Sequence, residues 1–449
     1  MEAVILAAGK GTRMHSKLPK VLHTVGNKPM LVHVIDSAES AGAKTIHIVV
    51  GNDGRQVKDK IRSFTFQNKI SWVLQTEQLG TAHAVQKAIP HVGTKTQNEH
   101  ILVLYGDVPL IRPDTLRQLL ASTRANTIGI LTLITAKNRG LGRILRDESS
   151  EIIGIVEEKD ASDSQKEIQE VNSGIMALPV GQLESWLGRI ERNNQQSEYY
   201  LTDIVALAVA EKVAISSVVV ANEMEVQGVN DKSQLVLVER HFQMTKSKAL
   251  LEKGVMLKDP SRVDIRGELN CGHDVEIDIN TLFEGNVTLG DNVKIGPNAV
   301  IKDSSIGNGT QILPGTIIEG ATIGEETILG PSARIRPGTI LKNKVKIGNF
   351  VETKNAVIGK GSKANHLAYI GDAEIGENCI IAGQVGFAGS STLGNYVMIG
   401  GQAGVSGHLN IGNNVQIGGG SGVINDIPDN TKVMGYPAKS LKNFIRESK

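Results

Sequence analysis

In this chain of 449 residues, the fold of the first half is indicated most clearly by the segment Ala3-Val4-Ile5-Leu6-Ala7-Ala8-Gly9-Lys10-Gly11-Thr12-Arg13-Met14, followed by Leu18-Pro19-Lys20. The apolar residues 3–6 are typical of a short buried parallel strand. Two glycines follow, and because they lack a Cβ the backbone can approach a ligand closely. Amide N–H groups in such a loop bind phosphate oxygens, and the nearby lysines and arginine can offset phosphoryl charge. The stretch therefore predicts a strand that runs into a phosphate-handling loop, rather than an ordinary turn with solvated basic residues.

Short apolar runs alternate with helical patterns through residues 1–229. Strands are predicted at 46–50, 101–105 and 129–133, and helices at 30–41 and 81–88. This alternation indicates an α/β, Rossmann-like domain with a mainly parallel sheet covered on both faces. Ligands bind beyond the carboxyl ends of such strands, so the Gly9 loop and Gly106-Asp107 are predicted to share one edge.

A period of six residues begins at Val287 and recurs as far as Ile417-Gly418, with an aliphatic and a small residue in register. A hexapeptide repeat is a mark of a parallel β-helix, with aliphatic side chains inside and Gly, Asn and Asp at the corners. Between the α/β region and the hexapeptide repeat, residues 233–253 lack Gly and Pro, and this segment predicts a helix. The predicted domains are therefore 1–229, a linker helix at 230–254, and a β-helix at 255–449.

Composition excludes several classes of function. The net charge is +1 and no basic block stands out, so binding to nucleic acid is not expected. No apolar run approaches the length of a membrane span, and the first residues lack the pattern of a secretory signal. The two cysteines, Cys271 and Cys379, have no metal-ligand spacing and fit a reducing compartment. We therefore expect a cytoplasmic protein.

The motif Leu-Ala-Ala-Gly-x-Gly-Thr-Arg-Met with its downstream Pro-Lys resembles the opening of the sugar-phosphate nucleotidyltransferases. Over about residues 1–376 the chain is most similar to the bacterial bifunctional enzymes that make UDP-N-acetylglucosamine. The resemblance implies uridylyl transfer from UTP to N-acetylglucosamine-1-phosphate with Mg²⁺. It also implies acetyl transfer from acetyl-CoA to glucosamine-1-phosphate, on a left-handed β-helix that assembles as a homotrimer.

The resemblance also implies the residues of the first site. Arg13 and Lys20 are expected to act on the phosphates, and Asp107 with Asn230 to hold Mg²⁺. Leu141 departs from the family, whose members usually carry an aromatic residue there. Nucleotide and sugar binding is expected of Leu6, Ala7, Ala8, Gly9, Lys20, Gln75, Gly80, Thr81, Tyr105, Gly106, Asp107, Gly142, Glu157, Asn172 and Asn230.

For the second site the resemblance implies His366 as the general base, since a pKa near neutral suits that task. Arg336, Lys354 and Tyr369 match the residues that bind the acetyl acceptor.

After residue 376 the family pattern changes. Ile380 stands where the family has Asn, and an expected Asn-Tyr-Asp-Gly block is missing. The tail instead resembles the UDP-3-O-acylglucosamine N-acyltransferases of lipid A synthesis, whose His-Asn pair would fall at Gly371-Asp372. The join keeps the hexapeptide register, so the coil is expected to fold, but acetyl transfer is expected to be weak or absent.

Two other interpretations stay open at this point. One is a non-catalytic regulatory protein that binds a sugar nucleotide; the paired Asp107 and Asn230 count against it, because a sensor needs no metal pair. The other is a lipid A N-acyltransferase with an added nucleotidyltransferase domain. The absence of the His-Asn pair counts against that one.

Overall fold

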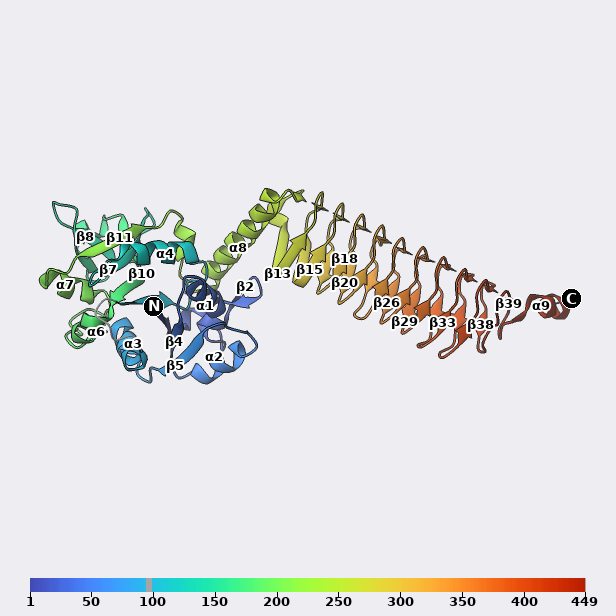
Figure 1. Ribbon diagram of the computed structural model, residues 1–449, viewed down its shortest axis with the longest axis horizontal. Coiled ribbons are helices and arrows are strands. Elements are labelled where there is room, and N and C mark those ends of the chain that lie inside the picture. Colours follow the sequence, from blue (N-terminus) through green and yellow to red (C-terminus); the bar gives the residue numbers. More distant parts are fainter. Residues whose placement is uncertain (94–98, 449) are drawn as a thin grey trace. The chain divides into compact units, whose positions relative to one another are not determined.

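The computed structural model describes residues 1–93 and 99–448 and divides into two compact units, Met1–Phe242 and Gln243–Lys449. Figure 1 shows the units joined by α8, which spans Lys232–Glu252 and lies where the sequence predicted a linker helix. Within the described ranges, no helix combines the length and the apolar character needed to cross a bilayer.

Unit 1 is built on a nine-stranded sheet, in which seven strands follow the order β11-β7-β10-β6-β1-β4-β5. The central strand β1 pairs in parallel with β4 and β6, so the chain segments that follow all three leave the sheet at one edge. The strands are β1 (Glu2–Ala7), β4 (Thr45–Val50), β5 (Lys69–Leu74), β6 (His100–Tyr105), β7 (Ile128–Ile134), β8 (Arg143–Arg146), β9 (Ile152–Val156), β10 (Glu170–Pro179) and β11 (Ile215–Val219). A separate hairpin pairs β2 (Thr24–Val25) with β3 (Lys28–Pro29).

Helices cover both faces of this sheet, because each helix has an apolar side that is buried against the sheet. One core contains residues of α1, α2 and α4, and the opposite core contains residues of α3, α6 and α7. The helices of the unit are α1 (Met30–Ser40), α2 (Gly54–Ile61), α3 (Thr81–Ala88), α4 (Pro113–Ser122), α5 (Asp163–Lys166), α6 (Val180–Leu187) and α7 (Asp203–Ala210).

The predicted strands and helices of unit 1 are confirmed, since β1, β4, β6, β7, α1 and α3 all lie where apolar periodicity placed them. The sheet is less uniform than a purely parallel one. Strand β10 runs antiparallel to both β6 and β7, and β8 and β9 form an antiparallel pair beside it. Gly142, Glu157 and Asn172, which line one side of the cavity described below, lie on these antiparallel strands or directly beside their ends.

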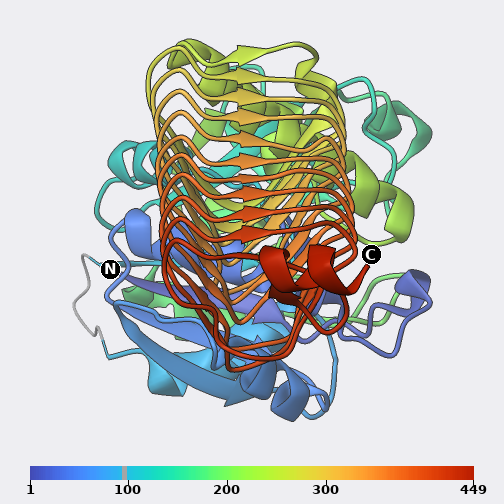
Figure 2. The same cartoon turned by 90° about the vertical axis from the view of Figure 1, so that its right-hand side faces the viewer.

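Unit 2 is a parallel β-helix, as predicted, and Figure 2 shows its coils stacked on one another. A 12-stranded ladder runs from β12 (Met256–Leu257) to β40 (Lys439–Ser440). A 17-stranded ladder runs from β13 (Val263–Cys271) to β38 (Gly422–Val423). The helix α9 (Leu441–Glu447) follows the last coil. The left-handed sense of the coil stays a prediction from the resemblance.

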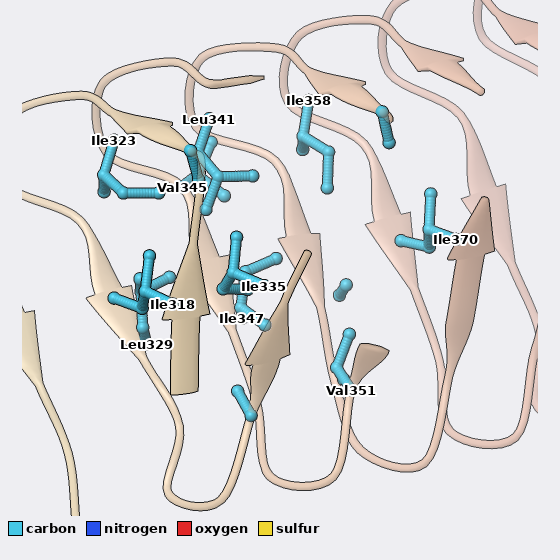
Figure 3. Close-up of a cluster of buried hydrophobic side chains, with 14 of the residues drawn as sticks. Ile318, Ile323, Leu329, Ile335, Leu341, Val345, Ile347, Val351, Ile358 and Ile370 are labelled. Atoms are coloured by element: carbon cyan, nitrogen blue, oxygen red, sulfur yellow. The ribbon is translucent and has the colours of Figure 1, made fainter. Parts of the chain in front are cut away.

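Aliphatic side chains fill the coil, and Figure 3 shows Ile318, Leu329, Ile335 and Ile347 pointing into its interior. Similar residues stack on one another in successive coils, and Leu329, for example, pairs with Ile347. The corners are left-handed turns, mostly at Asn, Asp and Gly, which tolerate a positive φ.

The two ladders continue without interruption past residue 376, where the sequence predicted a change to another family type. Ile375 pairs with Leu393, and Ile381 pairs with both Ala364 and Ile399. The tail therefore continues the same hydrophobic column as the coils before it, because its sequence keeps the spacing of the repeat.

Candidate functional site

A cavity of about 910 Å³ opens at the carboxyl edge of the unit 1 sheet. It collects the residues predicted for the first site, although they come from segments far apart in the sequence. Gly106 is the exception, because it lies between Tyr105 and Asp107 without lining the cavity itself. The predicted residues that line it are Leu6, Ala7, Ala8, Gly9, Arg13, Lys20, Gln75, Gly80, Thr81, Tyr105, Asp107, Gly142, Glu157, Asn172 and Asn230.

The glycine loop after β1 leads into a single 3₁₀ turn, Thr12–Met14, rather than into a long helix. Gly11 has a φ of 59°, and a Cβ placed on it would lie 2.8 Å from the Cβ of Lys20. A side chain at this position would therefore be strained by its backbone and would push Lys20 away. Gly9 faces open space, so its missing Cβ leaves room within the cavity.

Lys20 is the centre of a cluster of polar side chains that the sequence could not place together. Its ammonium contacts Asp107 Oδ2 and lies 3.1 Å from Asn230 Oδ1. The Lys20 and Asp107 side chains are only 14% and 15% exposed, so little water screens their contact. The loops that hold the two oxygens are also joined, since the Val229 N–H donates to the Asp107 carbonyl at 2.9 Å.

The segment predicted to read the base forms one wall of the cavity. Gln75 is buried, and its amide nitrogen donates to the Gly80 carbonyl at 3.2 Å. Gly80 has a φ of 124° and packs against the Tyr199 backbone, which leaves no space for a Cβ. Gln78, which was not among the predicted residues, donates its side-chain N–H to the Ala8 carbonyl and so ties this wall to the glycine loop.

The opposite wall carries the residues predicted for sugar binding. Burial raises the pKa of Glu157, although the Thr202 hydroxyl donates to Glu157 Oε1 at 3.1 Å and partly offsets that rise. Burial, with the charges of Glu157 and Asp107, also raises the pKa of Tyr105. The Asn172 N–H donates to the Gly142 carbonyl at 2.8 Å, which fixes the two candidate sugar ligands relative to each other.

The loop around Gly142 is anchored by Arg143, whose side chain is 1% exposed. The guanidinium donates to Glu158 Oε2 at 2.5 Å and to the carbonyls of Leu141 and Lys166. A buried guanidinium needs such a set of acceptors, since an unpaired charge inside a protein is costly. This anchor holds the loop without any aromatic residue at position 141.

Asp203, at the first position of α7, carries a carboxyl group whose pKa is raised to about 6 by burial and then by the charge of Asp160. The folded-state pKa exceeds the unfolded one, so the native state is favoured below about pH 4 and loses that advantage as pH rises through 6. We expect Asp203→Asn to raise the free energy of unfolding at pH 7.5 by about 1–3 kcal/mol, and to give no gain at pH 4.

Thermal melts at the two pH values would test this expectation. Asp163→Asn is the matched control, because Asp163 holds the same position in α5 but is fully exposed. The control variant is expected to have a lower melting temperature than the wild type at pH 7.5. A similar fall for Asp203→Asn would contradict the assigned cost of the buried charge.

The residues predicted for the second site lie in unit 2, on neighbouring coils. Arg336 Nη1 lies 2.8 Å from Glu352 Oε1, and Glu352 pairs in the ladder with Tyr369 of β29 (Tyr369–Gly371). Lys354 Nζ lies 3.9 Å from Asp372 Oδ2. His366 stands at a coil corner, where a Cβ on Gly383 would lie 2.6 Å from its Nε2. The four predicted side chains are exposed or partly exposed on the coil surface.

Several residues that line the cavity were not predicted as site residues, among them Gln78, Thr202 and Gln234. Each of these three acts through a contact to a predicted residue, and Gln234 Oε1 accepts a hydrogen bond from the Asn230 N–H at 2.7 Å. Its position was readable in principle, because Gln is common in the first turn of a helix, where it accepts backbone N–H groups. The hydrogen bonds of Gln78 and Thr202 could not be derived from the sequence, since their partners, Ala8 and Glu157, come from distant segments of the chain.

Family models match parts of both units of this chain. Residues 3–171 match the model of the MobA-like NTP transferase domain, so unit 1 contains a nucleotidyltransferase domain, and residues 265–351 match that of the GMPPB C-terminal domain. A solved UDP-glucose pyrophosphorylase in complex with UDP-glucose aligns over 54% of this chain and 97% of its own, with a TM-score of 0.45 and 18% identity.

Curated relatives match far more of the chain. The bifunctional protein GlmU of Pseudomonas entomophila is 45% identical over 376 residues, which are 84% of this chain and 81% of that protein. The protein of the same name from Neisseria meningitidis serogroup B is 51% identical over 376 residues, covering 84% of this chain and 80% of its own. A match of this length is longer than unit 1 and includes much of the β-helix. The chain therefore belongs to the family of bifunctional GlmU proteins.

Proposed function

We propose that unit 1 transfers a uridylyl group from UTP to N-acetylglucosamine-1-phosphate, with Mg²⁺, and releases pyrophosphate. The observation that carries this proposal is the meeting of the glycine loop, Lys20, Asp107 and Asn230 in one cavity of the nucleotidyltransferase domain. As nucleotidyltransferases, the members of this family handle a nucleoside triphosphate and a sugar phosphate, and they use a divalent metal. We propose in addition that the base is uracil, the sugar is N-acetylglucosamine and the metal is Mg²⁺.

The side chains present fit a divalent metal. Asp107 Oδ2 and Asn230 Oδ1 both contact the Lys20 ammonium, so the two oxygens are close enough to share a single cation. One carboxylate and one amide oxygen are donors that Mg²⁺ accepts, and substrate phosphates and water complete its coordination. When bound, the metal would offset the negative charge of the phosphate oxygens.

The mechanism needs no protein nucleophile. A phosphate oxygen of the sugar phosphate attacks the α-phosphorus of UTP in line, and the bond to the β-phosphate oxygen breaks as pyrophosphate leaves. Arg13 and Lys20 lie where they can neutralise the two anions and hold them together, and positioning of this kind supplies much of the rate.

The two walls of the cavity suit a base and a sugar. Gln75 offers a buried amide oxygen to a base N–H, and amides read base edges because they both donate and accept. Across the cavity, the Glu157 carboxylate, the Asn172 amide and the Gly142 backbone offer acceptors and donors for sugar hydroxyls. This division supports a nucleotide on one side and a sugar phosphate on the other.

A direct assay of the purified full chain tests this proposal. We expect pyrophosphate release that requires UTP, N-acetylglucosamine-1-phosphate and Mg²⁺ together, and that stops when the metal is chelated. Lack of pyrophosphate release with UTP and any of several sugar-1-phosphates would contradict the assignment. The interpretation as a non-catalytic regulatory protein is set aside by membership of an enzyme family.

We also infer a second activity, transfer of acetyl from acetyl-CoA to the amine of glucosamine-1-phosphate, on unit 2. Arg336 and Lys354 supply cations for the sugar phosphate, and the imidazole of His366 can take the proton that the amine loses. The expectation of a weak or absent second activity, drawn from the replaced tail, finds no support in the relatives, which are named bifunctional and match much of the β-helix. Acetyl-CoA consumption in the presence of glucosamine-1-phosphate tests this inference.

We propose a homotrimer, on the basis of the family and its long coil. Closed symmetry is the usual outcome for homo-oligomers, and the coil offers exposed apolar side chains, including Phe350, Leu367 and Tyr396, that an interface could cover. Light scattering at micromolar concentration is expected to give three times the chain mass of 48.0 kDa. A monomer mass under those conditions would contradict the proposal.

A further inference from the structure

Lys20 binds the same two oxygens that are proposed to hold the metal. Its ammonium contacts Asp107 Oδ2 and lies 3.1 Å from Asn230 Oδ1, which are the carboxylate and amide donors of the candidate metal site. The positive charge of the ammonium and the positive charge of a divalent ion therefore cannot occupy this position together. Both side chains of the Lys20–Asp107 pair are at most 15% exposed, which makes their attraction stronger than that of a surface pair.

The surrounding backbone holds all three groups in place. Gly11 allows the Cα–Cβ stem of Lys20 to approach the glycine loop, because a Cβ at position 11 would lie 2.8 Å from Lys20 Cβ. Asn230 is fixed from behind by Gln234, whose Oε1 accepts from the Asn230 N–H at 2.7 Å. Asp107 is tied to the same loop through the hydrogen bond from Val229 at 2.9 Å. The surrounding backbone therefore favours the contact of Lys20 with the two oxygens.

We propose that Lys20 competes with the divalent metal for Asp107 and Asn230, and that a bound triphosphate relieves this competition by giving the ammonium another partner. The proposal rests on the metal site of the proposed function. A cation on the site reduces the apparent affinity for a second cation in proportion to the fraction of molecules in which the two oxygens are still free. Phosphate oxygens in the cavity are strong acceptors for an ammonium, so they draw Lys20 away and leave the two oxygens to the metal.

The consequence is a coupling between the two ligands. The metal binds weakly to the protein alone and tightly together with the nucleotide, and by linkage it strengthens nucleotide binding by the same factor. Lys20 thus has two roles, as a cation at the phosphates and as a temporary occupant of the metal ligands. Removal of Lys20 is expected to weaken contacts to the nucleotide phosphates. It is also expected to strengthen metal binding to the nucleotide-free protein, which loss of an ordinary binding residue would not do.

Binding of Mn²⁺ to the full chain without nucleotide, followed by electron paramagnetic resonance, tests the proposal. We expect Lys20→Met to bind Mn²⁺ about tenfold more tightly than the wild type, as when nine-tenths of the sites are engaged by Lys20. Lys20→Gln is measured beside it, in case one replacement folds poorly. Lys10→Met is the matched control, since Lys10 lines the same cavity but, within the part of the chain that the structure describes, forms no hydrogen bond or ion pair with either oxygen. Its affinity is expected to stay within about twofold of wild type, because solvent screens an exposed charge.

Each outcome decides the proposal. Tighter binding in both Lys20 variants, lost again when Asp107→Asn is added, supports competition at these two oxygens. Unchanged or weaker Mn²⁺ binding in both Lys20 variants overturns it, and so does an equal gain in Lys10→Met, because bulk charge would then explain the effect. Pyrophosphate release by the wild type is measured separately, so that a failure of the proposed function is distinguished from a failure of the competition.

Discussion

Asp107→Ala is expected to lower the rate of pyrophosphate release by roughly a thousandfold or more, while the protein stays folded. A bound metal that neutralises a phosphoryl oxygen contributes several kcal/mol to the barrier, and each 1.36 kcal/mol is a factor of ten in rate. Asp107 supplies the only carboxylate of the proposed metal pair, and Asn230 alone brings no charge to the ion. The carboxylate follows β6 at the open edge of the sheet and does not belong to the apolar core.

Steady-state assays at saturating UTP, with Mg²⁺ varied over a wide range, would measure the loss. Asp114→Ala serves as the control, because Asp114 is an exposed carboxylate on α4 that pairs with Arg117 outside the cavity. Its rate is expected to match the wild type, and its melting temperature is expected to fall only slightly, because an exposed ion pair contributes little. A rate for Asp107→Ala within tenfold of the wild type, at any concentration of Mg²⁺, would show that Asp107 is not the principal metal ligand.

The sequence predicted the elements of both units because their signals are local. The apolar run 3–6 is confirmed as part of β1, and the hexapeptide period is confirmed as the parallel coil whose register joins Leu329 to Ile347. The antiparallel direction of β10 could not be predicted from such local signals. Its reversal depends on how β8 and β9 fold back beside it, and that is a tertiary feature.

The candidate site was predictable only as a set of residues. Glycine spacing, strand ends and the family resemblance indicated Lys20, Asp107 and Asn230 one by one. Their contact could not be derived, because the residues are 87 and 210 positions apart in sequence and meet only when three loops reach one sheet edge. The raised pKa of Asp203 depends likewise on burial and on Asp160, and neither is visible in a linear motif.

The second site gives the other large expected effect. His366→Ala is expected to lower acetyl transfer to glucosamine-1-phosphate by ~10²–10⁴-fold, the usual contribution of a general base. The imidazole faces solvent at a coil corner and its Nε2 lies beside Gly383, so its removal opens no cavity in the hydrophobic column. Stability is therefore expected to change little, and uridylyl transfer is expected to stay at the wild-type rate.

Two controls make this result specific. His273→Ala removes an exposed histidine from an early coil and is expected to leave both activities unchanged. Asp107→Ala is expected to lower uridylyl transfer by roughly a thousandfold or more while acetyl transfer continues, so the two variants separate the two sites. Acetyl transfer by His366→Ala within threefold of the wild type would show that another group takes the proton. Loss of acetyl transfer with retained binding of glucosamine-1-phosphate would assign the proton-transfer step to His366, because the residues at 336, 354 and 369 that are expected to bind the sugar phosphate are still present in this variant.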